Sequence, residues 1–290
     1  VPFQARHKVK KSDPRALQNS RGRFKIAPAA FKTTPRASQS FPRSPQDHLV
    51  IAQDVLDSSL DSLLFDVSLH VGTGLAVAVY FRKRIATLIV ASAKYLVGSS
   101  TEPTGHQQAT IILIATVPAA VAGFFLHEII ETYTREPWLI VLTLTVGGIF
   151  LWKSDSNQEI TSGINRLRIH DAISIGLAQA IALVPGFSRS AMTIGAARLL
   201  GISRRDSAEL SFLLALPIIF GAGLFTIIGA DSTEHNGTLA NFAVGILTSF
   251  ACGLLVIKYL IRYLENHSLQ MFVWYRFALA AVITVVLLLP

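Results

Sequence analysis

Apolar runs separated by short polar segments fill the chain from residue 48 to its end. A helix crosses the hydrocarbon core of a bilayer with about 20 apolar residues. Six runs approach that length, and a seventh, Ile85–Val97, is apolar but shorter. We therefore predict an all-α polytopic membrane protein with roughly six to seven spans. The six longer runs are Leu63–Phe81, Ala109–Leu126, Trp138–Trp152, Ala208–Gly229, Ala240–Leu264 and Met271–Leu289.

Two further apolar runs, Asp171–Leu183 and Ala191–Gly201, are too short to cross a bilayer and are separated by Pro185-Gly186. Irregular backbone persists at membrane depth only where protein buries it or where it lines a cavity. Short, Pro/Gly-interrupted segments of this kind are typical of re-entrant helices that hold a binding site. We expect a re-entrant helical hairpin, with Pro185–Thr193 at the bottom of a polar cavity.

The composition agrees with a membrane protein, because 51% of the residues are hydrophobic and only 15% are charged. An ordinary soluble domain carries more charge than this. The net charge of +8 arises from residues 1–47, which hold eleven Lys and Arg residues against Asp13 and Asp47. These basic residues form no nucleic-acid-binding pattern, so we expect membrane lipids as partners and no nucleic acid.

Residues 1–47 differ in character from the remainder of the chain. They are rich in Lys, Arg, Ser and Pro and show no helical or strand period. Such a segment cannot bury an apolar face, which predicts disorder, and its composition also resembles an organelle transit peptide. We expect a disordered or non-authentic extension over residues 1–47 and an integral membrane domain over residues 48–290.

Polar residues suited to an oxyanion gather between the two short runs. Gly186 allows a tight turn, Ser188 and Ser190 supply hydroxyls, and Thr193 follows one helical turn later. Arg189 presents a planar fork of donors that matches phosphate oxygens. A helix that starts near Ser190 would direct its free N–H groups to the same place. This pattern predicts a phosphate cradle, and the alternative is a snorkelling Arg189 beside an N-cap formed by Ser190.

The stretch "LAQAIALVPGFSRSAMTIGAARLLGISRRDSAELSFLLALP" resembles the undecaprenyl-diphosphate phosphatase (bacitracin-resistance) family. That family has a Pro-Gly-x-Ser-Arg-Ser motif followed by Thr, and then Ser-Phe-Leu-Leu-Ala-x-Pro. The resemblance continues through "HLVIAQ", "SLLFDVSLHVGTGLAVAVYFRKR" and "MFVWYRFALAAVI", so it covers residues 48–290. It implies a fold of inverted repeats, each contributing one re-entrant helical hairpin.

The resemblance implies hydrolysis of undecaprenyl (polyprenyl) diphosphate to the monophosphate and inorganic phosphate in the cell inner (plasma) membrane. This reaction recycles the lipid carrier for cell-wall synthesis and gives bacitracin resistance. Arg189 would clamp the diphosphate, and either Ser188 or a water molecule would attack it. The implied catalytic residues are Arg189, Ser188 and His48, and the implied substrate-binding residues are Gly186, Phe187, Ser190 and Thr193.

The first repeat of this chain departs from the family pattern. The family carries a Glu-x-x-x-Glu motif, and Pro35 and Gln39 stand at the corresponding positions. The resemblance implies a divalent cation, Mg²⁺ or Ca²⁺, but its ligands are not identifiable in this chain. A transporter or flippase for a phosphorylated lipid and an inactive remnant of the phosphatase therefore remain as alternatives. A homodimer is a candidate assembly.

Two single residues within apolar runs also carry expectations. Cys252 is the only cysteine, so an intramolecular disulfide is excluded and a buried core position is expected. Arg276 follows aromatic residues in the last apolar run. An ionisable residue at this depth needs a partner. We expect Arg276 to form an ion pair or an interface anchor rather than to contact substrate.

Overall fold

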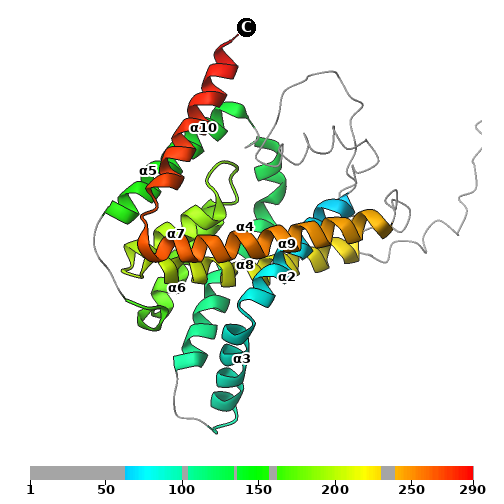
Figure 1. Ribbon diagram of the computed structural model, residues 1–290, viewed down its shortest axis with the longest axis vertical. Helices are drawn as coiled ribbons and strands as arrows, with labels where there is room; N and C mark the ends of the chain where they lie inside the picture. The colour runs from blue at the N-terminus through cyan, green and yellow to red at the C-terminus, as the bar shows by residue number, and fades with distance from the viewer. Residues whose placement is uncertain (1–62, 100–103, 134–135, 157–161, 230–238, 290) are drawn as a thin grey trace, which may run out of the picture. The chain divides into compact units, whose positions relative to one another are not determined.

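The computed structural model describes residues 63–99, 104–133, 136–156, 162–229 and 239–289. All of these residues belong to one compact unit, residues 40–290. Within the described ranges the chain forms nine α-helices and one 3₁₀ turn, η3 (Ile164–Arg166), without a β-strand (Figure 1). The prediction of an all-α protein is confirmed. The helices are α2 (Leu63–Tyr80), α3 (Arg82–Leu96), α4 (Thr104–Tyr133), α5 (Pro137–Ser156), α6 (Ile169–Ile181), α7 (Arg189–Leu199), α8 (Arg204–Gly229), α9 (Leu239–Asn266) and α10 (Gln270–Leu288).

Five of the described helices contain a stretch that is long and apolar enough to cross a membrane. Their outward faces carry large exposed apolar side chains, as lipid contact requires. The multi-pass prediction is thus confirmed, although the described residues supply five spans where six to seven were expected. The five stretches are Thr104–Leu126, Pro137–Ser156, Arg204–Gly223, Phe242–Asn266 and Gln270–Leu288.

The remaining expected segments form shorter helices. Helix α2 has 18 residues, slightly fewer than the five spans, and α3 starts with three basic residues and has 15 residues. The predicted division between residues 1–47 and residues 48–290 stays a prediction, because the chain up to residue 62 lies outside the described residues.

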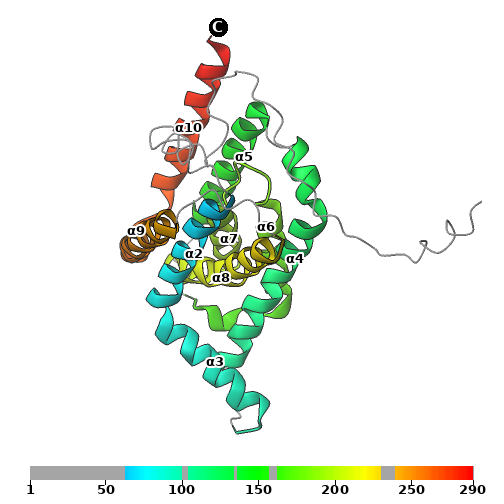
Figure 2. The same cartoon turned by 90° about the vertical axis from the view of Figure 1, so that its right-hand side faces the viewer.

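Small residues allow α2 and α9 to pack closely along each other. Gly72 of α2 faces the backbone carbonyl of Ile246, and Gly253 of α9 faces the side chain of Ala76. The Thr73 and Ser249 hydroxyls lie 2.7 Å apart, which adds a polar contact between the two helices. Figure 2 shows the two helices side by side. On the outward side of α9, Cys252 is exposed, so the expectation of a buried cysteine was wrong. The reason is that an apolar run in a membrane protein has a lipid-facing side.

Helices α6 and α7 form the helical hairpin that the short apolar runs predicted. The two helices pack on each other, and their 13 and 11 residues are fewer than a span needs. The Asp171 carboxylate accepts a hydrogen bond from the Arg168 N–H at 2.8 Å and caps the start of α6. At the end of α7, Gly201 has φ +86° and closes a Schellman motif. The inverted-repeat relation stays a prediction.

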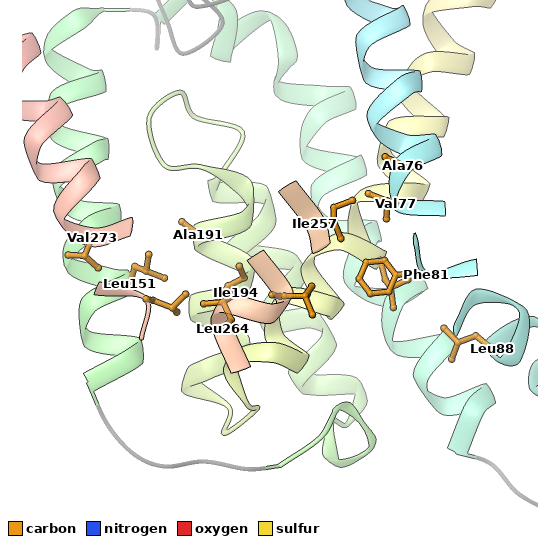
Figure 3. Packing of buried hydrophobic residues seen from close by; sticks show 14 residues of the cluster. Ala76, Val77, Phe81, Leu88, Leu151, Ala191, Ile194, Ile257, Leu264 and Val273 are labelled. Atoms are coloured by element: carbon orange, nitrogen blue, oxygen red, sulfur yellow. The ribbon is translucent and has the colours of Figure 1, made fainter. Parts of the chain in front are cut away.

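Helix α7 is enclosed by α5, α6 and α8 (Figure 2). Every residue from Ala191 to Arg198 is buried. Figure 3 shows Ala191 and Ile194 packed in a cluster that also includes Leu151, Leu264 and Val273. The loop that precedes α7 is therefore attached to a helix whose residues 191–198 are buried among its neighbours.

A buried ionic cluster fixes the C-terminal end of α7. The Asp155 carboxylate accepts hydrogen bonds from the Nε atoms of Arg198, at 3.2 Å, and Arg204, at 2.7 Å. It also accepts the Leu269 N–H at 2.8 Å. One carboxylate of α5 thereby connects α7, α8 and the turn before α10, and it neutralises Arg198, whose exposed fraction is 2%.

Candidate functional site: the loop before helix α7

The loop between α6 and α7 turns sharply at two residues with positive φ. Gly186 has φ +93° and Ser188 has φ +63°. Glycine adopts this conformation freely, whereas a serine there is strained by about 1–3 kcal/mol. Backbone strain of this kind is concentrated at binding and catalytic sites. The strained residue is one of those that the sequence singled out.

Ser188 is the N-cap of α7, since its hydroxyl accepts the Ala191 N–H at 3.5 Å. The Ser188 and Ser190 hydroxyls lie 3.3 Å apart, and both residues are exposed. The sequence-based alternative assigned the cap to Ser190; in the structure Ser188 takes that place and α7 starts at Arg189. Two accessible hydroxyls therefore lie together at the positive end of a helix.

Arg189, the first residue of α7, is half-buried. Burial lowers the pKa of its guanidinium from the ordinary value, because desolvation disfavours the charged form. Among the described residues no carboxylate pairs with it. A partly desolvated cation without a carboxylate, next to free helix N–H groups, suits a bound oxyanion.

Thr193 does not direct its hydroxyl to this cluster. Its exposed fraction is 2%, and the hydroxyl donates to the Arg189 carbonyl at 2.9 Å and lies 2.7 Å from the Ser211 hydroxyl. In the structure Thr193 joins α7 to α8. Its assignment as a substrate-binding residue stays a prediction.

The structure brings five of the seven predicted site residues together at the tip of the hairpin. They are Gly186, Phe187, Ser188, Arg189 and Ser190. Phe187 is half-buried and packs against the apolar cluster around α6 and α7. His48 lies outside the described residues, as do Pro35 and Gln39, where the family has glutamates.

The described residues do not supply a metal site. No group of three or more His, Cys, Asp or Glu side chains within these ranges could hold a metal ion. Hard cations such as Mg²⁺ and Ca²⁺ need several oxygen ligands. The divalent cation therefore stays a prediction, and no chemical step is derived through it.

Two residues that the sequence did not assign to the site contact the loop directly. The Thr143 hydroxyl of α5 donates to the Pro185 carbonyl at 2.7 Å, and Arg276 Nη2 of α10 donates to the Gly186 carbonyl at 2.8 Å. Arg276 is 5% exposed, which does not fit an interface anchor, and it forms no ion pair with a described residue, so the expected ion pair stays a prediction. An arginine within an apolar run was the available signal. Thr143 carried no signal, because its partner lies 42 residues away in sequence.

Comparison with known proteins agrees with the motif at this loop. The family model described as "Bacitracin resistance protein BacA" matches residues 38–282. The undecaprenyl-diphosphatase of Pelotomaculum thermopropionicum is 40% identical over 232 residues, which cover 79% of this chain and 84% of that protein. The undecaprenyl-diphosphatase of Rubrobacter xylanophilus is 38% identical over 83% of this chain and 90% of that protein. Undecaprenyl-diphosphatase 1 of Pseudoalteromonas translucida is 34% identical over 83% and 91%, respectively. The chain belongs to the bacitracin resistance protein BacA family.

Proposed function

We propose that this chain hydrolyses undecaprenyl diphosphate to the monophosphate and inorganic phosphate. Its curated relatives carry the name undecaprenyl-diphosphatase. The single observation that carries the proposal is the guanidinium of Arg189, which has no carboxylate partner among the described residues and starts α7 between two exposed serines. A diphosphate supplies the negative charge that this arrangement lacks.

The geometry supports phosphoryl transfer by charge neutralisation and positioning, which are the main contributions of a protein to this reaction. Arg189 and the first N–H groups of α7 bind oxygens of the terminal phosphate. The nucleophile attacks the terminal phosphorus, and the bond from that phosphorus to the bridging oxygen breaks. The bridging oxygen leaves with the lipid monophosphate.

Two nucleophiles give the same products. The Ser188 hydroxyl can attack first, and water then hydrolyses the resulting phosphoserine; alternatively, water attacks the substrate directly. Ser188 is exposed and its hydroxyl lies 3.3 Å from that of Ser190. Both routes place the reacting phosphorus at the start of α7, so both require Arg189.

The lipid substrate agrees with a site carried on a hairpin among apolar helices. We place the protein in the inner (plasma) membrane, where the reaction would recycle the lipid carrier for cell-wall synthesis and give bacitracin resistance.

A homodimer belongs to the same proposal, and the mass of the protein in detergent can be measured by light scattering to test it. A divalent cation, Mg²⁺ or Ca²⁺, is also proposed: a chelator should stop phosphate release, and the required ion should restore it.

The testing experiment measures phosphate release from a long-chain prenyl diphosphate by the purified full chain in detergent. Arg189→Ala should lower kcat/KM by about 100-fold or more, because a charge-assisted contact to the reacting group is lost. Arg189→Lys should retain part of the activity, since it keeps the charge without the fork. Arg205→Ala is the matched control, because Arg205 forms an exposed ion pair with Glu265. Activity that survives Arg189→Ala would contradict the proposal.

The same protein in vesicles distinguishes the remaining alternatives. A transporter or flippase would move the lipid across the bilayer without releasing phosphate. An inactive remnant would bind the lipid but would neither move it across the bilayer nor release phosphate. Phosphate release in detergent, where no compartment exists, contradicts both alternatives.

A further inference from the structure

The last described helix places a buried cation against the site loop. Arg276 of α10 donates from Nη2 to the Gly186 carbonyl at 2.8 Å and to the Thr143 carbonyl at 3.5 Å. Its Nε is buried without a hydrogen-bond partner among the described residues. A charged side chain in an apolar span is unfavourable and usually has a specific role. The hydrogen bonds of Arg276 to described residues all go to backbone carbonyls, one of them in the loop.

Thr143 contacts the preceding peptide of the same loop. A threonine in a helix commonly bonds the carbonyl one turn earlier. The Thr143 hydroxyl lies 2.9 Å from the Leu139 carbonyl, but the Pro185 carbonyl is closer, at 2.7 Å. Two successive loop carbonyls, from Pro185 and Gly186, are thus bound by side chains of α5 and α10.

These contacts decide which polar groups the loop can offer to a phosphate. The oxygen of a peptide carbonyl carries partial negative charge and repels an anion. In a trans peptide, the C=O and the N–H point in opposite directions. Because the Pro185 carbonyl is directed at Thr143, the Gly186 N–H points away from α5, and no described residue accepts it. The loop is therefore held with its Pro185 and Gly186 carbonyls occupied.

We infer that Arg276 and Thr143 are positioning residues for the phosphate-binding loop. They hold the Pro185 and Gly186 carbonyls and so fix the backbone that leads into Ser188 and Arg189, without contact to the substrate. The inference rests on the proposed function for its kinetic test. Small displacements of reacting groups lower rates by up to about 100-fold.

Glycines of α5 provide a matched pair of variants. A Cβ on Gly147 would collide with the Arg276 guanidinium and lie 3.3 Å from Phe187 Cδ1. A Cβ on Gly148, the next residue, would instead lie 2.7 Å from Phe277 Cε1. Gly147→Ala should displace Arg276 from the loop, whereas Gly148→Ala disturbs the same α5–α10 contact without touching Arg276.

The kinetic experiment compares phosphate release by full-length variants. Arg276→Met, Thr143→Val and Gly147→Ala should each lower kcat/KM by about 10- to 100-fold, mainly through kcat. Thr143→Ser should restore most of the rate, since it keeps the hydroxyl. Arg276→Met combined with Thr143→Val should lose less than the product of the single losses, because both act on one loop. If Arg276→Met does not fold, the Thr143→Val and Thr143→Ser pair carries the test.

Hydrogen–deuterium exchange tests the inference independently of activity. Peptides that cover residues 182–190 should exchange faster in Arg276→Met and Thr143→Val than in the wild-type chain. Their exchange rate should not change in Gly148→Ala. If the wild-type chain releases no phosphate, the proposed function fails while this measurement still decides the positioning role. Equal kinetic losses in Gly147→Ala and Gly148→Ala, or exchange in this loop that does not change, would overturn the inference.

Discussion

At the scale of single residues, two features of Gly186 exclude any other residue at this position. One is its backbone conformation, and the other is the lack of room for a Cβ atom. Its φ of +93° is unfavourable for an L-residue, and a Cβ would collide with the Thr143 hydroxyl and approach the Ile140 carbonyl to 3.0 Å. The collision partner is the residue that bonds the Pro185 carbonyl. Any substitution here must therefore move the loop.

We predict that Gly186→Ala destabilises the protein by about 1–3 kcal/mol or more and removes most phosphate release. Thermal unfolding in detergent and the phosphate assay measure the two effects. Gly98→Ala isolates the backbone effect, since Gly98 has φ +70° and open space around it. Gly221 also has open space around it but no positive φ, so Gly221→Ala should leave stability almost unchanged. An active, stable Gly186→Ala protein would contradict the geometry of the loop.

Sequence reasoning identified Arg189 and the serines because residue type and spacing encode them. It could not find that Thr193 bonds Ser211, 18 residues away, or that Arg276 bonds Gly186, 90 residues away. Both contacts depend on how α7, α8 and α10 pack, which no local pattern specifies. The direction of a hydroxyl is a tertiary property.

At the scale of helices, the ends of the hairpin were predictable to within two residues. The expected ranges were Asp171–Leu183 and Ala191–Gly201, and the helices are α6 (Ile169–Ile181) and α7 (Arg189–Leu199). Pro185, Gly186 and Gly201 mark the interruptions, because proline lacks an N–H and glycine accepts positive φ. The cluster around Asp155 had no such signal, since its members come from four different elements.

We predict that Asp155→Ala destabilises the protein by about 3–5 kcal/mol, because it leaves the buried Arg198 without its carboxylate. The unfolding midpoint in detergent should fall accordingly. Glu265→Ala is the control: Glu265 pairs with Arg205 at 3.1 Å on the surface, and its loss should change stability by about 0–1 kcal/mol. Similar midpoints for the two variants would show that the buried cluster does not fix the end of α7.

At the scale of the whole molecule, hydropathy gave the class of protein, because lipid exposure demands continuous apolar runs. It did not give the pairing of α2 with α9 or α5 with α10, which depends on matching small residues across helices. Hydropathy also could not predict that Cys252 is exposed. An apolar residue in a span faces either protein or lipid, and hydropathy is the same for both.

Cys252 provides a test of the orientation of α9, because it is the only cysteine and is exposed within the span Phe242–Asn266. A charged, water-soluble thiol reagent should leave it unmodified in sealed or leaky vesicles and modify it after unfolding in SDS. As a positive control, Asn165→Cys in a Cys252→Ser background should react in leaky vesicles, since Asn165 is exposed in η3. Rapid modification of Cys252 in leaky vesicles would place that face of α9 in water.

The burial of residues 191–198 of α7 limits which substitutions members of this family can accept there. Residues 191–198 have no face directed at water or lipid, so each replacement changes the volume of a closed space or leaves a polar group unpaired. The outward residues of α9 can exchange freely among apolar types. A saturation mutagenesis library selected for function should therefore tolerate almost nothing across residues 191–198 and a broad apolar set on the exposed side of α9. Natural variants that preserve the fold should therefore arise around this buried segment, in the residues that contact it, rather than within residues 191–198.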